Sequence, residues 1–178
     1  MGIDIDHYIR AVSSTDLGGF KSEHGDAFLV RSTTDGEMDR EEPAEAQTTP
    51  GRSHPTALVL PSIKSDTEPA KSRYYVYPVR ATRSSSTEIT VGRVPAMDVC
   101  VPDRSISRLH AVFAPLGDGR YRLEDKDSRN GTFIARKQLE PGRPMIVRSG
   151  QTVQFGNIVL AFFQAGQFVE FLYKTRDG

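Results

Sequence analysis

The chain has 178 residues, no net charge, and 37% hydrophobic residues, which is low for a chain that is packed throughout. We therefore expect one domain joined to an unpacked extension. The single cysteine excludes an internal disulfide, and the sequence shows neither a leader nor an apolar run of about 18 residues, so we expect a cytoplasmic, reduced protein without a membrane segment.

Residues 1–72 form an acidic N-terminal extension with a net charge of −6, which we expect to be largely disordered. Apolar residues at helical spacing predict a short helix over residues 5–12, and we expect Gly18 and Gly19 to break it. The apolar segment at residues 27–30 is either a strand or a plug on the domain. The rest of the extension is rich in Thr, Ser and Pro, which is typical of a disordered linker.

From residue 73 the sequence changes to short runs of β-branched and aromatic residues between turn residues. The run from Arg120 to Glu124 alternates polar and apolar positions, as a half-buried antiparallel strand should. This spacing predicts an all-β sandwich over residues 73–164, followed by a helix over residues 165–178 that packs on it. Strands are expected at residues 74–79, 88–91, 98–101, 111–116, 120–124, 132–134, 145–147, 152–155 and 158–163.

This second part carries a net charge of +6, so the neutral total hides two oppositely charged parts of the chain. A basic module predicts an anionic ligand, and the acidic extension is a candidate to associate with it. Two merely solvated surfaces explain the same charges. Both interpretations stay open at this point.

Three clusters of glycine and polar residues lie beside the predicted strands: Gly92-Arg93, Ser107-Arg108 with His110, and Arg129-Asn130-Gly131. Loops that follow alternate strands emerge at the same end of a small sheet, so we expect the clusters to converge. They would then form an anion receptor. Arg93 would offer a fork of donors that matches phosphate, Ser107 a hydroxyl and Arg108 a second cation. Asn130 would add an amide that can read a peptide backbone.

The order and spacing of Gly-Arg, Ser-x-x-His and Ser-x-Asn-Gly-Thr resemble the forkhead-associated (FHA) domain, an antiparallel β-sandwich that binds phosphothreonine peptides. The match runs from about Tyr74 to Phe163. The resemblance implies that Arg93 and Ser107 contact the phosphate and that Arg108 assists. It also implies a bacterial type of signalling protein, whose partner is phosphorylated by a Ser/Thr protein kinase.

The same resemblance assigns Arg129 and Asn130 to the main chain of the bound peptide. His110 is expected to brace its loop from behind, because it begins a strand and lies three residues after Ser107. Gly92 and Gly131 are expected to serve backbone shape. The family resemblance therefore divides the site into residues that touch the ligand and residues that support them.

Other classes of function fit the sequence less well. Ser107, His110 and Asp127 nominally supply a nucleophile, a base and an orienting acid, but the sequence has no nucleophile elbow and no phosphate-cradling loop with its lysine, so we expect no catalysis and no cofactor. The four histidines are scattered and Cys100 lies between two valines, so no metal site is expected. The cations are dispersed and lack an aromatic stacking motif, which argues against nucleic acid.

We therefore predict a phosphothreonine-dependent protein–protein interaction module in Ser/Thr kinase signalling. The alternative is an FHA-like scaffold that binds its partner without phosphate. Thr34, Thr48 and Thr49 lie in the acidic extension, and Thr34 is followed by Asp35 and Glu37. Once phosphorylated, such a threonine would meet a receptor on its own chain, which resembles the self-binding of some bacterial FHA proteins. A linker that only stays soluble is equally consistent.

Overall fold

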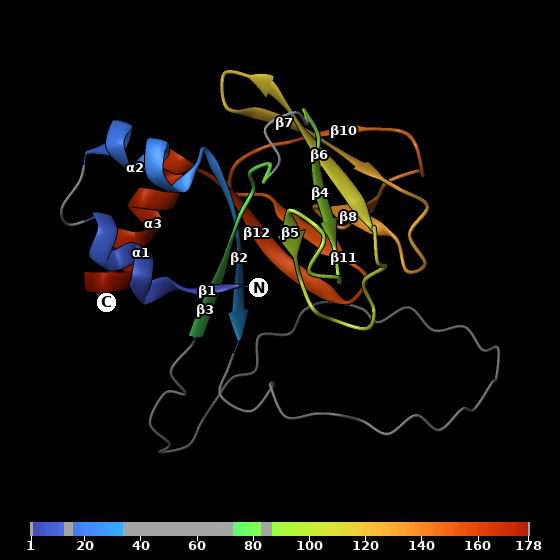
Figure 1. Cartoon of the computed structure of the whole chain (residues 1–178), viewed down its shortest axis with the longest axis horizontal. Helices are drawn as coiled ribbons and strands as arrows, with labels where there is room; N and C mark the ends of the chain where they lie inside the picture. The colour runs from blue at the N-terminus through green and yellow to red at the C-terminus, as the bar shows by residue number, and fades with distance from the viewer. Residues whose placement is uncertain (1, 13–15, 34–72, 83–86, 178) are drawn as a thin grey trace, which may run out of the picture.

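The computed structural model describes residues 2–12, 16–33, 73–82 and 87–177. Two β-sheets pack face to face, and the helices gather beside one of them, as Figure 1 shows. The predicted linker, including Thr34, Thr48 and Thr49, lies outside the described residues. No helix in the described part of the chain is long and apolar enough to cross a membrane.

The first sheet is antiparallel and contains seven strands within the described residues. Their order is β1 (Ile3–Asp4), β3 (Arg73–Pro78), β2 (Ala27–Thr33), β12 (Ile158–Gln164), β11 (Thr152–Phe155), β8 (Thr132–Ile134) and β9 (Lys137–Gln138). Antiparallel neighbours can be joined by tight turns, and the β11–β12 connection has only two residues, Gly156 and Asn157. That turn matters for the site, because it lies beside the loops described below.

The second sheet contains five strands in the described segments. Their order is β10 (Met145–Val147), β7 (Arg120–Asp125), β6 (Ala111–Gly117), β4 (Ile89–Gly92) and β5 (Val99–Cys100). All neighbours are antiparallel except β4 and β5, which pair in parallel. As a result β4 ends, β6 begins and β7 ends at the same end of this sheet.

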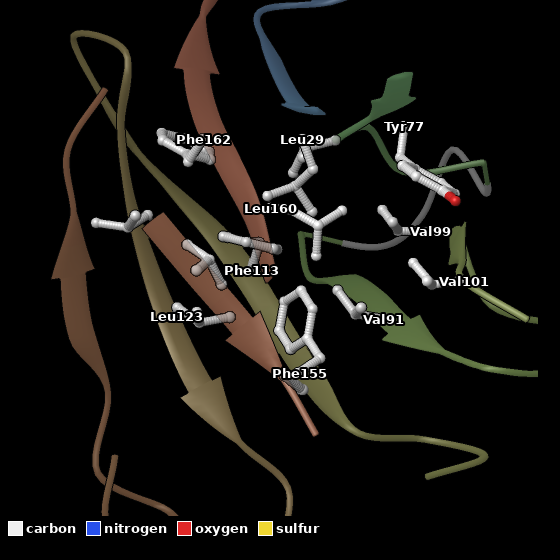
Figure 2. Close-up of a cluster of buried hydrophobic side chains, with 14 of the residues drawn as sticks. Leu29, Tyr77, Val91, Val99, Val101, Phe113, Leu123, Phe155, Leu160 and Phe162 are labelled. Carbon is white, nitrogen blue, oxygen red and sulfur yellow. The ribbon is translucent and has the colours of Figure 1, made fainter. Parts of the chain in front are cut away.

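The core between the sheets is made of alternate residues from facing strands (Figure 2). In β12, Leu160 and Phe162 are buried whereas Val159 is 51% exposed, as the two-residue period of a strand requires. Phe162 stacks on Phe113 with ring centroids 5.8 Å apart. Aromatic rings of this size dominate the apolar area removed from water, so this core fixes the two sheets against each other.

A second apolar cluster lies on the outer face of the seven-stranded sheet. Helices α1 (Ile5–Val12), α2 (Leu17–His24) and α3 (Ala165–Asp177) cover β2 and β3 there, with Tyr8, Phe20 and Phe168 buried among them. Phe28 stacks on Phe168 with centroids 4.3 Å apart. The sheet is therefore covered on both faces along β2.

Burial on both faces explains the sequence of β2. Ala27 and Leu29 belong to the core between the sheets, whereas Phe28 and Val30 belong to the helical cluster. A strand buried on both sides reads as a continuous apolar run rather than as an alternating one. For that reason the segment did not show a clear strand period in the sequence.

The structure confirms the predicted sandwich, the short helix near the N-terminus and the C-terminal helix that packs on the sandwich. The predicted strands at residues 132–134, 145–147 and 152–155 match at both ends. The extent of the sandwich differs from our prediction, because β2 pairs with both β3 and β12. Residues 27–33 are thus part of the sheet, although we placed them in the extension.

The prediction that Gly18 and Gly19 end the helical segment is wrong, since both lie inside α2. Asp16 caps this helix, and its carboxylate accepts a hydrogen bond from the backbone N–H of Gly19 at 2.9 Å. Each glycine costs a helix about 1 kcal/mol relative to alanine. The cap and the complete burial of Phe20 outweigh that cost.

Candidate functional site

The three predicted clusters come together at one end of the sandwich, where β4 and β7 end and β6 begins. The backbone N–H of Arg93 donates to the carbonyl of Ser107 at 3.1 Å, and that of Arg129 donates to the Ser107 hydroxyl at 3.1 Å. The β11–β12 turn joins them, because the N–H of Asn157 donates to the Ser105 hydroxyl at 3.0 Å. Backbone hydrogen bonds thus connect loops far apart in the sequence.

An open cavity of about 640 Å³ lies between these loops. Four of the five residues that we predicted to touch a ligand line it, whereas Asn130 is not among the lining residues. The lining consists of Arg93, Met97, Arg104, Ser105, Ile106, Ser107, Arg108, Leu109 and Arg129. The cavity is therefore rich in guanidinium groups, with apolar side chains beside them.

Ser107 is the point at which the loops meet. Its N–H donates to Nδ1 of His110 at 3.0 Å, and its carbonyl accepts from Arg93. Its hydroxyl oxygen accepts from Arg129, which leaves the O–H free to donate. A half-buried hydroxyl held in this way presents a donor to the cavity in a fixed position.

His110 is fully buried behind Ser107. Because Nδ1 accepts from Ser107, the neutral ring carries its proton on Nε2, which lies 3.1 Å from the carbonyl of Gly131 and donates to it. Burial lowers the pKa of His110, although the Gly131 carbonyl and the charge of Asp125 act in the opposite direction. The geometry is that of a brace between two loops.

Two glycines shape the same loops. At Gly92 a Cβ atom would lie 2.0 Å from the carbonyl oxygen of Arg108, so only glycine permits this close approach of the two backbone segments. Gly131 has a φ of 80°, in the region that L-residues with side chains rarely adopt. A Cβ there would also lie 2.7 Å from the amide nitrogen of Gln138.

The exposed side chain of Asn130 also links two of the loops. Its side-chain N–H donates to the carbonyl of Ser105 at 2.7 Å. The Ser105 hydroxyl in turn donates to the carboxylate of Asp103 at 2.6 Å. The amide oxygen of Asn130 forms no hydrogen bond with the described residues, so it remains an acceptor beside the cavity.

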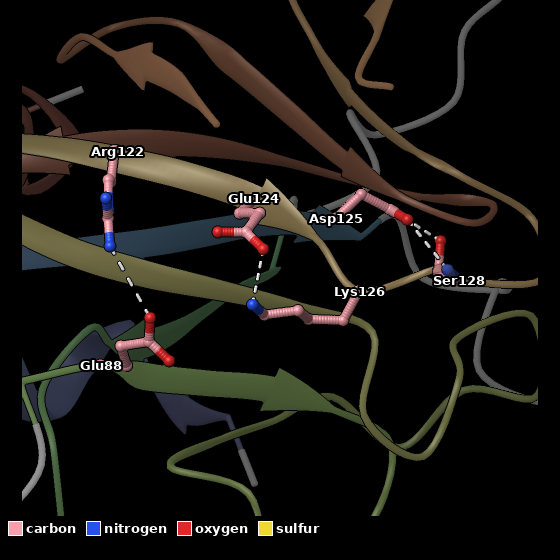
Figure 3. A network of polar contacts seen from close by, with 6 residues as sticks. All are labelled: Glu88, Arg122, Glu124, Asp125, Lys126 and Ser128. Carbon is pink, nitrogen blue, oxygen red and sulfur yellow. Dashed lines mark hydrogen bonds and ion pairs between the residues drawn. The ribbon is translucent and has the colours of Figure 1, made fainter. Parts of the chain in front are cut away.

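Sequence reasoning missed the role of Asp125. This buried carboxylate accepts from the N–H and the hydroxyl of Ser128 at 2.9 and 2.6 Å, and from the hydroxyl of Thr132 at 2.5 Å. Figure 3 shows its contact with Ser128. The signal in the sequence was an acidic residue at the inward-facing position of an alternating strand, where a carboxylate is buried only when it is hydrogen-bonded. Asp125 therefore fixes the loop that carries Arg129.

Asp98 plays a similar part between β4 and β5. It accepts hydrogen bonds from the N–H and hydroxyl groups of both Thr82 and Thr90, at distances of 2.5 to 2.8 Å. Burial raises the pKa of Asp98, but these hydrogen bonds outweigh it and lower the pKa to about 2. This carboxylate ties the end of the loop that follows β4 back to Thr90 in that strand.

The cations of the site differ from those on the nearby sheet. On the outer face of the five-stranded sheet Arg122 lies 3.7 Å from Glu88 and Lys126 lies 2.5 Å from Glu124 (Figure 3). In contrast, the four arginines that line the cavity are exposed, and their side chains form no ion pair with any described residue. They are Arg93, Arg104, Arg108 and Arg129.

The arrangement does not form a catalytic triad. The imidazole of His110 bonds the backbone N–H of Ser107, and the Ser107 hydroxyl is turned to Arg129 instead. Asp127 forms no hydrogen bond with either of them. Among the described residues, no group of three His, Cys, Asp or Glu side chains is placed to hold a metal ion.

A family model described as FHA domain matches residues 89–156. The chain contains an FHA domain. The matched segment includes all eight residues that we predicted for the site, from Gly92 to Gly131. The resemblance stated from the sequence motifs is thereby confirmed.

Several curated proteins are similar to part of this chain. The oxoglutarate dehydrogenase inhibitor of Corynebacterium diphtheriae is 37% identical over 75 residues, which are 42% of this chain and 50% of that protein. The glycogen accumulation regulator GarA of Mycolicibacterium smegmatis is 36% identical over 73 residues, or 41% of this chain and 44% of that one. The chain thus spans about half the length of the curated relatives it matches. The names of these two relatives are those of an inhibitor and a regulator.

Among solved structures, the N-terminal FHA domain of Saccharomyces cerevisiae Rad53p in complex with a phosphothreonine peptide is 24% identical. It covers 53% of this chain and 88% of that one, with a TM-score of 0.44. The FHA domain of the Chlamydia trachomatis protein CT664 is 18% identical, covers 77% of this chain and 96% of that one, and has a TM-score of 0.43.

Proposed function

We propose that this FHA domain is a phosphothreonine-dependent protein–protein interaction module in Ser/Thr kinase signalling, without catalytic activity of its own. The observation that carries the proposal is the open cavity lined by four unpaired arginines around the Ser107 hydroxyl. Unpaired guanidinium groups beside a fixed O–H donor suit a phosphate group, which is dianionic and rich in acceptors. The names of the relatives, an inhibitor and a regulator, support a signalling role.

In this proposal Arg93 and Ser107 bind the phosphate and Arg108 assists. The hydrogen bond to Ser107 fixes the backbone of Arg93, so the side chain that carries the guanidinium is anchored at a defined position. A planar guanidinium can form two parallel hydrogen bonds with phosphate oxygens, and the Ser107 O–H can donate a third. Gly92 brings the Arg108 segment close enough for both loops to share one anion.

Arg129 and Asn130 would hold the main chain of the peptide. Asn130 uses one amide N–H on Ser105 and keeps its amide oxygen and its second N–H for a ligand. That pair matches the alternating N–H and C=O groups of an extended peptide. His110 and Gly131 would keep the loop in the shape that presents these groups.

Titration calorimetry with a phosphothreonine peptide library tests the proposal. We expect binding of phosphorylated peptides, no binding of the same peptides without phosphate, and loss of binding in Arg93→Ala. The alternative, a scaffold that does not need phosphate, predicts equal binding of both peptide forms. If Arg93→Ala binds phosphorylated peptides as tightly as the parent does, with an unchanged melting temperature, this site does not recognise phosphate.

We further propose that a phosphorylated threonine of the acidic extension, Thr34, Thr48 or Thr49, can occupy the site of its own chain. The described strands support this, because Thr33 at the end of β2 pairs with Arg73 at the start of β3. β2 runs antiparallel to β12, which starts at the β11–β12 turn beside Ser105. The segment between β2 and β3 thus leaves and re-enters the fold at the end that carries the cavity.

A ligand on the same chain benefits from an effective concentration of about a millimolar. Kinase-treated protein should therefore bind an external phosphopeptide more weakly than untreated protein does. The matched control is the triple variant Thr34→Ala, Thr48→Ala, Thr49→Ala after the same treatment. If that variant loses external affinity as strongly as the parent, self-binding through these threonines is excluded.

A further inference from the structure

The charge of the cavity exceeds that of a single phosphate. Four arginines line it, and none of the described residues that line it is acidic. The carboxylates of Asp103 and Asp125 in these loops accept hydrogen bonds from Ser105 and from Ser128 and Thr132. The four guanidinium groups form no ion pair with any described residue, so direct charge partners remain available to a ligand.

A phosphothreonine carries a charge of about −1.5 to −2 at neutral pH. Arg93 and Arg108, the two cations assigned to the phosphate, are enough to balance it. Arg104 and Arg129 then form an ion pair neither with a described residue nor with the phosphate in a complex with an otherwise neutral peptide. Unbalanced like charges around one cavity repel each other, and a ligand that neutralises them relieves this repulsion.

The second pair of arginines lies next to Asn130, which we propose to hold the peptide main chain. Asn130 bonds the carbonyl of Ser105, so the Arg104-Ser105 and Arg129-Asn130 segments are neighbours. Arg129 is also held to the Ser107 hydroxyl through its backbone N–H. A group next to the phosphothreonine in an extended peptide is therefore within reach of these two side chains.

We propose that the preferred ligands are phosphothreonine segments that carry a second anionic group beside the phosphothreonine, and that Arg104 and Arg129 bind that group. The second group is either a carboxylate of Asp or Glu or a second phosphate. This inference rests on the proposed function and adds the class of sequence that the site selects. Arg104, which sequence analysis did not assign to the site, becomes a residue that determines specificity.

Three kinds of phosphothreonine peptide, built on one sequence, test the inference by titration calorimetry with the full chain. The reference peptide has glutamine at the flanking positions. A series of peptides has glutamate at one of these positions at a time, and a further peptide has a second phosphothreonine. Exposed ion pairs of this kind are worth little individually, so we expect roughly a 3- to 10-fold higher affinity for the best glutamate peptide than for the glutamine peptide. A larger gain with the second phosphate than with glutamate would identify phosphate as the source of the second charge.

Arg104→Gln should lose most of the preference for the anionic peptides over the glutamine peptide, when both affinities are measured in the same variant. The matched control is Arg120→Gln, which removes one exposed positive charge from the β6–β7 hairpin at the opposite end of the sandwich. That control should keep the preference. If it loses the preference as Arg104→Gln does, the effect is one of net charge and the assignment to Arg104 is wrong.

The outcomes separate this inference from the proposed function. Equal affinity for neutral and anionic peptides, with binding that still requires phosphothreonine and Arg93, would overturn the inference and leave the proposed function intact. An Arg104→Gln variant that weakens all peptides equally would also overturn it. Failure of every phosphothreonine peptide to bind would overturn the proposed function itself.

Discussion

The two ends of the β-sandwich are built in different ways. At the cavity end, buried polar groups hold the loops from beneath: His110 joins Ser107 to Gly131, and Asp125 joins Ser128 to Thr132. The cations above them form no ion pair with any residue that the structure describes. His110 and Gly131 are 21 residues apart in the sequence, so the loop shape depends on tertiary contacts.

At the opposite end, the β6–β7 hairpin turns mainly through local geometry. Gly117, Asp118 and Gly119 all have positive φ, and a Cβ atom at Gly117 would meet nothing within 4 Å. A tertiary hydrogen bond from the side-chain amide of Gln164 to the carbonyl of Gly119 also holds this turn. The cation there, Arg120, lies 3.7 Å from Asp118. The difference teaches that the cations without an ion pair lie on loops held by several buried tertiary contacts, whereas the hairpin pairs its cation and depends mostly on its own backbone conformation.

The largest effect should come from removing Arg93, the cation that we propose to bind the phosphate. Arg93→Ala should weaken binding of a phosphothreonine peptide by about 2 to 5 kcal/mol, because the dianionic phosphate loses its charge-assisted hydrogen bonds from the guanidinium. Arg120→Ala, at the hairpin end, should leave affinity unchanged. Titration calorimetry measures both, and equal losses in the two variants would contradict the comparison of the two ends.

The next largest effect should be the difference in stability between substitutions at Gly92 and at Gly117. Gly92→Ala forces a Cβ atom against the carbonyl of Arg108, and overpacking of this kind costs typically about 1 to 3 kcal/mol in the free energy of unfolding. Gly117→Ala meets open space, so only its positive φ counts, at about 1 kcal/mol. Chemical denaturation should show the larger loss for Gly92→Ala. Equal losses would mean that the close approach at Gly92 is easily relieved.

His110→Gln should destabilise the chain by about 1 to 3 kcal/mol, because it leaves buried backbone groups without their partners. It should also change the dependence on pH. Since burial lowers the pKa of His110, the unfolded chain takes up the proton at a higher pH than the folded chain does. The stabilisation is therefore complete above the unfolded pKa of about 6.5 and is lost as the pH falls through the lower folded pKa.

Melting curves of the parent and of His110→Gln between neutral and mildly acidic pH check the sign. The parent should lose stability more steeply on acidification than the variant does. An identical slope in the two proteins would show that His110 does not titrate with folding. The hairpin end, by contrast, has no histidine among its described residues from Gly117 to Arg120.

The smallest effect should come from removing one methyl group of the ligand. A phosphoserine peptide of otherwise identical sequence should bind about 1 kcal/mol more weakly than the phosphothreonine peptide, because one methyl group remains unburied. The cavity offers apolar side chains such as Met97 and Leu109 beside its cations. Equal affinities for the two peptides would indicate capture of any anion rather than control by shape.

Much of the fold could be predicted because its strands carry local signals. β7 alternates polar and apolar residues, and turn residues mark both of its ends. β2 and α2 lacked such signals, since burial on both faces removes the alternation of β2 and a cap at Asp16 overrides the two glycines of α2. In both cases tertiary burial decided the structure against the local pattern.

The site followed a similar division. The cations and the serine could be named as candidates from their order in the chain, because the three clusters match the order and spacing of the FHA pattern. The contact of Asn130 with Ser105 could not be named, since the two residues lie 25 positions apart and meet only in the folded chain. The role of Asp125 was missed, although its inward-facing position in an alternating strand was a signal. Sequence analysis did not name Arg104, which enters the candidate site only through its place in the cavity lining.

Ser107 engages its N–H, its carbonyl and its hydroxyl oxygen with three different segments of the chain before any ligand arrives. The conformational entropy of these loops is therefore lost when the protein folds rather than when it binds. Ordering a flexible loop on binding would subtract from affinity, at roughly 0.5 to 1.5 kcal/mol for each side chain immobilised. Under the proposed function, a phosphopeptide would meet loop backbones that are already ordered, so the ordering cost would fall on the peptide and on the exposed arginine side chains.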